Sequence, residues 1–138
     1  MSFIPINYED GKTVLMPVAN SVTTVRGGCM IDDGSGYLTP AAAGCNFDIH
    51  YVSAEVVTTT AAGQLVMCWE THGVKFLADT DAAWAQTNIG LEVDLASVST
   101  LDIDAVTDQL FYVERGVGTA GTDTQVEGYF TLGVPNLS

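Results

Sequence analysis

Residues 76–117 read FLADTDAAWAQTNIGLEVDLASVSTLDIDAVTDQLFYVERGV. Apolar side chains occupy every second position of its short runs, among them Gly90–Leu95, Leu101–Ile103 and Leu110–Glu114. Such alternation is typical of β-strands that turn one face towards a core and the other towards water. Aspartate-rich turns separate the runs, and few groups in the segment could do chemistry. The segment therefore predicts a scaffold of strands whose function lies in contact with other molecules.

The whole chain has the length and composition of one β domain. Its 138 residues are enough to bury a core without a disulfide or a metal. Valine and threonine are frequent and lysine is nearly absent, a mixture that favours pleated sheet over helix. We predict an all-β fold, a compact antiparallel β-barrel or β-sandwich formed by residues 13–138, with one short helix. Residues 1–12 carry isolated apolar side chains around Pro5 and Gly11, and we predict that they form an extended N-terminal arm.

Turn signals divide the rest of the chain into short strands. The clearest turn is Asp32-Asp33-Gly34-Ser35-Gly36, since Asp-Gly and Ser-Gly supply the positive φ angles of tight hairpins. A short helix is predicted at residues 81–86, capped by Asp79 or Thr80, with Trp84 plugging one end of the barrel. The strands are predicted at residues 13–17, 23–30, 37–40, 47–57, 64–69, 74–78, 90–95, 101–103, 109–115 and 125–132.

The formal charge of -13 arises from seventeen acids against four Lys and Arg residues. Nucleic-acid binding depends on clustered Lys and Arg, so we expect no DNA or RNA partner. No stretch approaches the roughly 20 apolar residues of a membrane span, and the amino terminus lacks the basic and apolar regions of a secretory signal. We expect a soluble protein that is made in the cytoplasm and has no membrane partner. The dispersed acids are interpreted as solubilising charges at turns and strand edges.

The three cysteines are odd in number and lack CxxC spacing, which indicates reduced thiols. Cys45 with His50, and Cys68 with His72, are residue types that bind zinc. Along a strand, however, residues five apart face opposite sides, and residues four apart are separated by about 13 Å at ~3.3 Å per residue. Neither pair converges on one metal without a bulge or turn, so we expect no metal site.

Other site motifs are incomplete. The acids of residues 102–108 lack the ligand spacing of a calcium loop. Gly116–Gly121 matches the dinucleotide-binding string GxGxxG, but a predicted strand follows it instead of a helix, so we interpret it as a flexible hairpin loop. No serine lies in a GxSxG elbow, and the separation of Glu55 from Glu70, a possible acid and base, depends on the fold. We predict that the chain is not an enzyme and has no cofactor.

The order of strands and turns resembles a family of virus proteins. Val14-Leu15-Met16-Pro17-Val18-Ala19 and residues 32–41 are similar to the opening of small tailed-bacteriophage proteins that coat the capsid. Residues 76–79, 85–90, 92–95 and 101–105 resemble the second half of these capsid decoration, or cement, proteins. The resemblance covers residues 13–131. It implies a compact β-barrel or β-sandwich, a homotrimer, and attachment to the outside of an expanded phage head at threefold or quasi-threefold positions.

The resemblance also implies a partner, the major capsid protein, and a location on the capsid exterior of the virion. A cement protein bridges neighbouring capsid subunits, and a trimer multiplies modest contacts into strong attachment. Three alternatives are a tail, neck or fibre-associated β-domain of a phage, a carbohydrate-binding β-sandwich favoured by the aromatic side chains, and a hydrolase using His50 or His72. The predicted contact residues are Phe3, Ile4, Ile6 and Tyr8 of the arm and Gly116, Gly118, Thr119 and Asp123 of the loop at residues 116–123.

Overall fold

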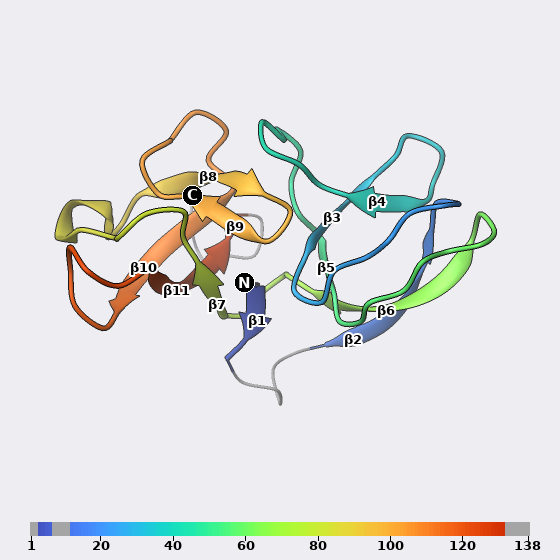
Figure 1. Cartoon of the computed structure of the whole chain (residues 1–138), viewed down its shortest axis with the longest axis horizontal. Helices are drawn as coiled ribbons and strands as arrows, with labels where there is room; N and C mark the ends of the chain where they lie inside the picture. Colours follow the sequence, from blue (N-terminus) through green and yellow to red (C-terminus); the bar gives the residue numbers. More distant parts are fainter. Residues whose placement is uncertain (1–2, 7–11, 132–138) are drawn as a thin grey trace.

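The computed structural model describes residues 3–6 and 12–131 and is built almost entirely of strands. Figure 1 shows two lobes side by side, one containing β2 to β6 and the other β7 to β11, with β1 between them. The predicted all-β class is confirmed. The elements are β1 (Phe3–Pro5), β2 (Thr13–Val18), β3 (Cys29–Asp32), β4 (Leu38–Pro40), β5 (Tyr51–Ser53), β6 (Gln64–Glu70), β7 (Phe76–Asp79), the 3-10 helix η1 (Gln86–Asn88), β8 (Glu92–Ser97), β9 (Thr100–Asp102), β10 (Phe111–Val117) and β11 (Gln125–Phe130).

The first lobe is a closed barrel with the strand order β2-β4-β3-β5-β6. β2 pairs antiparallel with β6 along its whole length, from Thr13 opposite Trp69 to Val18 opposite Gln64. The barrel closes where Val18 also pairs in parallel with Leu38 of β4. Its interior is a small apolar core of Val18, Met30, Leu38, Val66 and Cys68.

The second lobe is a curled sheet with the strand order β1-β7-β11-β10-β8-β9. The sheet curls back on itself where Thr80, the residue after β7, forms a parallel bridge with Leu101 of the edge strand β9. The backbone N–H of Asp81 donates to the Leu101 carbonyl at 2.9 Å and fastens the same junction. This half-barrel stands beside the closed barrel, so the predicted compact barrel architecture is confirmed.

One hydrophobic core joins the two lobes. Four phenylalanine rings are fully buried in it, and the ring of Phe130 lies 5.1 to 5.2 Å, centroid to centroid, from the other three. Ile49, Val52 and Trp69 of the closed barrel belong to the same cluster. Each fully buried aromatic or branched side chain contributes about 1.5–3 kcal/mol to folding. The shared core fixes the position of each lobe against the other. The four rings are those of Phe3, Phe76, Phe111 and Phe130.

Residues 3–5 are part of the sheet, so the prediction of an arm ahead of the first strand is wrong for them. Phe3 pairs with Ala78 of β7, and its N–H donates to the Gly27 carbonyl at 2.9 Å. Burial of the Phe3 ring outweighs the weak strand signal of so short a segment. Residues 1–2 and 7–11 of the predicted arm lie outside the described residues.

The prediction of a helix at residues 81–86 is also wrong. The structure has the short 3-10 turn Gln86–Asn88 at the end of this segment instead. The carboxylate of Asp81 accepts the Ile103 N–H at 3.1 Å, which holds the segment against β9 in an unwound form. Asn88 then fixes the turn, because its side chain accepts from the Ala85 N–H at 2.7 Å and donates to the Ile103 carbonyl at 3.1 Å. Tertiary hydrogen bonds override the local helix propensity.

Two predicted strands are much shorter than their apolar patterns indicated. Of the strand predicted at residues 23–30, only Cys29 and Met30 lie in β3, and of the strand predicted at residues 47–57, only Tyr51–Ser53 forms β5. Thr23 makes an isolated bridge with Thr58. Thr24 explains part of the difference, since its hydroxyl donates to the Glu55 carbonyl at 2.8 Å and accepts the Val57 N–H at 2.9 Å. Threonine side chains that bond to the backbone in this way replace ladder hydrogen bonds.

Candidate interaction surfaces

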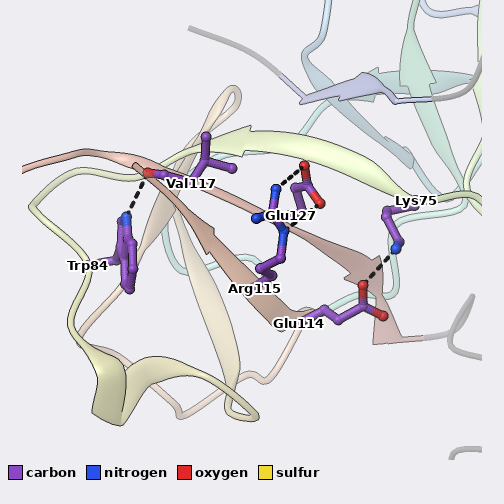
Figure 2. Close-up of polar contacts among 6 residues, drawn as sticks. All are labelled: Lys75, Trp84, Glu114, Arg115, Val117 and Glu127. Atoms are coloured by element: carbon purple, nitrogen blue, oxygen red, sulfur yellow. Dashed lines mark hydrogen bonds and ion pairs between the residues drawn. The ribbon is translucent and has the colours of Figure 1, made fainter. Parts of the chain in front are cut away.

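The hairpin predicted at residues 116–123 is present, but Gly116 and Val117 are still paired in β10, and the loop begins at Gly118. This hairpin is fastened to the segment before η1. Figure 2 shows the indole Nε1 of Trp84 donating to the Val117 carbonyl, at 3.0 Å. The Gly121 N–H donates to the Trp84 carbonyl at 2.8 Å, and the Trp84 N–H donates to the Asp123 carbonyl at 3.1 Å. Trp84 is buried as predicted, and it packs beneath this hairpin.

The loop residues predicted as contacts also have structural roles. A Cβ atom added to Gly116 would overlap the Trp84 indole, and one added to Gly118 would overlap the carboxylate of Asp123. That carboxylate accepts the Thr119 N–H at 2.6 Å and closes the turn. Residues 118–123 are exposed. Their contact with another protein therefore stays a prediction, whereas both glycines have a reason within the chain itself.

The N-terminal contact residues occupy different environments. Phe3 is fully buried in the core, so the prediction that it touches a partner is wrong. Ile4 is partly buried and packs against the same core, while Ile6 is 42% exposed. Tyr8 lies outside the described residues. Of the described members of this set, Ile6 presents the most apolar surface to a partner.

The residues considered for zinc are not gathered into one site. Cys68 is buried in the barrel core, and burial raises its pKa to about 11. Burial also raises the pKa of Cys29 well above its ordinary value, with the nearby Cys45 as a second cause. His50 and His72 line a shallow hollow instead. Within residues 3–6 and 12–131, no group of three Cys, His, Asp or Glu side chains could hold a metal ion, and all three thiols are free.

Glu55 and Glu70, the possible acid and base, lie in different environments. Glu55 Oε2 accepts the Met67 N–H at 2.7 Å, beside the edge of β6. Glu70 lines the shallow hollow together with both histidines and Lys12. The first carboxylate therefore supports the backbone of the barrel.

Several aspartates build turns by accepting backbone N–H groups. Asp94 is 7% exposed. Its carboxylate accepts three backbone N–H groups, those of Thr107, Asp108 and Gln109, at 2.7–3.1 Å. In the β3–β4 turn, Asp32 accepts the Gly34 N–H at 2.7 Å. Part of the acidity of the chain is thus a requirement of its turns.

Among the described residues, Lys75 and Arg115 form ion pairs on the outside of the half-barrel (Figure 2). Lys75 Nζ lies 2.7 Å from Glu114 Oε1, and the Arg115 guanidinium lies 3.0 Å from Glu127 Oε2. The hydrogen bond from Arg115 is the largest cause of the lowered pKa of Glu127. The hydrogen bond to Glu114 likewise raises the pKa of Lys75. These pairs leave the described surface strongly anionic.

Sequence reasoning missed an apolar strip on the outer wall of the closed barrel. Leu15 of β2 lies directly opposite Met67 of β6, and Leu65 lies two residues before Met67 on the same face. The Ala54 N–H donates to the Met67 carbonyl at 2.9 Å, which brings the segment containing Val56 alongside β6. The apolar strip consists of Leu15 (56% exposed), Val56 (68%), Leu65 (56%) and Met67 (43%).

The sequence does contain a signal for this strip. Residues 65–69 read LVMCW, an apolar run without polar alternation, which is typical of a strand that is covered on both faces. Val66 and Cys68 fill the barrel interior, while Leu65 and Met67 face outward. The outer face of β6 therefore has the composition of a surface that another molecule covers.

Comparison of the chain with protein-family models, curated proteins and solved structures found no match. No helix in the described part of the chain is long and apolar enough to cross a membrane.

Proposed function

We propose that the chain is a structural virion protein, a capsid decoration or cement protein that binds the outside of a phage head and bridges major capsid subunits. The observation that supports this proposal best is the apolar strip of Leu15, Val56, Leu65 and Met67 on an otherwise acidic barrel. Exposed apolar side chains that adjoin on one face are typical of protein contact sites. The surrounding acids disfavour association with anionic partners and so restrict which surfaces can dock.

The fold suits a clamp. Because both lobes share one core, the strip on β2 and β6 and the loop at residues 116–123 are held at fixed positions. Contacts made from two fixed places on one body engage together, so their effects on affinity multiply. In the proposal the protein acts as a homotrimer, which repeats each contact three times around a symmetry axis of the shell. Pulling capsid subunits apart would then require several contacts to break at once.

The first test is the location of the protein on particles of the virus that encodes it. Electron microscopy of purified particles should show many copies on the head exterior at threefold or quasi-threefold positions. A few copies at the neck, tail or fibres would replace the proposal with the alternative of a tail-associated β-domain. Particles that contain no copies would refute both structural roles.

The second test concerns the strip. The assay is co-sedimentation of the added protein with phage heads that lack it. The double variant Leu15→Ser with Met67→Ser should bind these heads about tenfold more weakly than the natural chain, because apolar anchors dominate contact energies. Its thermal stability should change little, since both side chains are exposed. Val106→Ser is the matched control, because Val106 is 46% exposed and lies outside the strip. Equal sedimentation of all three proteins would remove the strip from the mechanism.

A further inference from the structure

The closed barrel carries a groove, separate from the apolar strip, that combines acidic and apolar walls. Its wide end is a hollow of about 550 Å³. A narrower hollow of about 260 Å³ shares the lining residues Asp32, Asp48 and His50 with it, so the two hollows adjoin. We call the two adjoining hollows together the acidic groove. Its wide end is lined by Asp32, Asp33, Gly34, Phe47, Asp48 and His50, and its narrow end adds Met16, Met30, Ile31, Gly36, Leu38 and Tyr51.

The groove exists because the barrel closes over a short distance. β2 pairs with β6 along its whole length but meets β4 in the single pair Val18–Leu38. Beside this seam the narrow hollow reaches Met16, Met30 and Leu38, which belong to the barrel core or pack against it. The floor of the groove is thus apolar and continuous with the core. Methionine side chains adapt their shape to an incoming group at low energetic cost.

The rim of the groove is anionic and exposed. Asp32 and Asp33 each use Oδ1 to accept backbone N–H groups of the β3–β4 turn. The ion pairs Lys75–Glu114 and Arg115–Glu127 both lie on the half-barrel, away from this rim. Phe47, at the same end, is 64% exposed. A ligand that enters therefore meets carboxylate oxygens at the rim, an aromatic face beside them and aliphatic side chains below.

We propose that the acidic groove binds an arginine-bearing apolar segment of a partner protein. A planar guanidinium can bond in parallel to carboxylate oxygens and stack on an aromatic ring, which the rim and Phe47 offer together. Apolar neighbours of that arginine would cover Met16 and Leu38 on the floor. The volume falls within the ~300–1,000 Å³ of typical ligand sites. A lone metal ion would leave the apolar floor unused.

This inference does not depend on the proposed attachment to a capsid. It concerns a different face of the barrel, and it is tested on the full chain in solution without any particle. Loss of head binding would leave the groove unaffected. Failure of the groove would equally leave the apolar strip in place.

The probe is an acetylated five-residue peptide with arginine between two leucines and a serine at each end. Titrated to millimolar concentration into the ¹⁵N-labelled chain, it should shift the NMR signals of the Gly34, Ser35 and Phe47 amides. A matched peptide with citrulline, which keeps the shape of arginine without its charge, should bind at least about tenfold more weakly. Equal binding of both peptides, signals that move elsewhere, or no movement would overturn the proposal. Concentration-dependent shifts of the same amides without peptide would assign the groove to a second copy of the chain and would also overturn it.

Charge-removing variants identify the rim. Asparagine keeps the side-chain oxygen that accepts the turn N–H groups, so the β3–β4 turn should persist without its charges. The rim variant should bind the arginine peptide about tenfold more weakly, which corresponds to roughly twofold to threefold for each exposed carboxylate. The control variant removes the same number of charges from the half-barrel and should bind within about twofold of the natural chain. Equal weakening by both would indicate general attraction to an acidic protein and refute the site. The rim variant is D32N/D33N/D48N, and the control is D102N/D104N/D108N.

Discussion

The indole of Trp84 packs against the bare backbone of Gly116, where a Cβ atom would overlap the indole atoms Cδ2, Cε2 and Cζ2. The indole Nε1 donates to the Val117 carbonyl at 3.0 Å, and the Trp84 backbone bonds to Gly121 and Asp123 across the hairpin. The first glycine of the GxGxxG string is therefore required by an aromatic contact within the chain. A phosphate-binding role is not needed to explain it.

Gly116→Ala should lower the free energy of unfolding by about 1–3 kcal/mol, because the methyl group forces the indole out of place. Urea unfolding followed by circular dichroism measures the loss. A double-mutant cycle with Trp84→Ala isolates the cause. In the Trp84→Ala background the added methyl group should cost little, since nothing large faces it. The same cost in both backgrounds would show that the indole is not what excludes the side chain.

Phe3→Ala should destabilise the protein by about 3–5 kcal/mol, because it removes a fully buried ring from contact with Phe111 and Phe130. Phe3→Leu keeps most of the volume and should cost roughly 1 kcal/mol, so the effect stays measurable if the alanine variant fails to fold. Ile6→Ala is the control, since Ile6 is 42% exposed, and its cost should be within about 0.5 kcal/mol. Similar thermal unfolding of all three variants would place Phe3 outside the core.

Regular strands are predicted well from the sequence, whereas elements that depend on distant partners, such as β1, are not. The ranges 13–17, 64–69 and 125–132 lie close to β2, β6 and β11, because alternation along a strand is a local property that survives folding. β1 has only three residues. It forms a strand because it pairs with β7 and because Phe3 packs against the other buried phenylalanines. The segment at residues 81–86 has helical composition, but Asp81 bonds to Leu101 of β9 and to Ile103 just after it, which prevents the helix. Long-range partners of this kind leave no local pattern.

The candidate sites divide in the same way. The apolar strip has a local signal, the run LVMCW, which indicates a strand covered on both faces. The acidic groove has none, because it depends on where β2 meets β4 and on the approach of Asp48 to the β3–β4 turn. The sequence does not separate a core role from a contact role for Phe3, because an apolar residue near a chain end gives the same local pattern whether it packs on a partner or on its own core.

The carboxyl group of Glu127 should titrate below its ordinary pKa of 4.5, mainly because Arg115 donates two hydrogen bonds to it, at 3.0 and 3.2 Å. A lowered folded-state pKa means that the pair contributes stability above pH 4.5 and that this contribution is lost as the pH falls through the folded value. Carbon-13 NMR of the labelled side chain measures the midpoint. Arg115→Met should move it up towards 4.5, whereas Lys12→Met, which removes an equal charge elsewhere, should not. An unchanged midpoint in Arg115→Met would exclude the guanidinium as the cause.

Asp94→Ala should be strongly destabilising, because this buried carboxylate of β8 is the acceptor for the N–H groups of Thr107, Asp108 and Gln109. We expect a loss of about 2–4 kcal/mol in urea unfolding, since each hydrogen bond to a charged acceptor contributes roughly 1.5–3 kcal/mol and solvent replaces only part of that loss. Asp94→Asn keeps Oδ1, the acceptor for Asp108 and Gln109, and should lose less. Hydrogen exchange of the Asp108 amide should accelerate in the same order. Asp104→Ala, at an exposed acid nearby in sequence, should leave both measurements unchanged. If Asp94→Ala behaved like that control, the turn at residues 105–109 would have to be held by something other than this carboxylate.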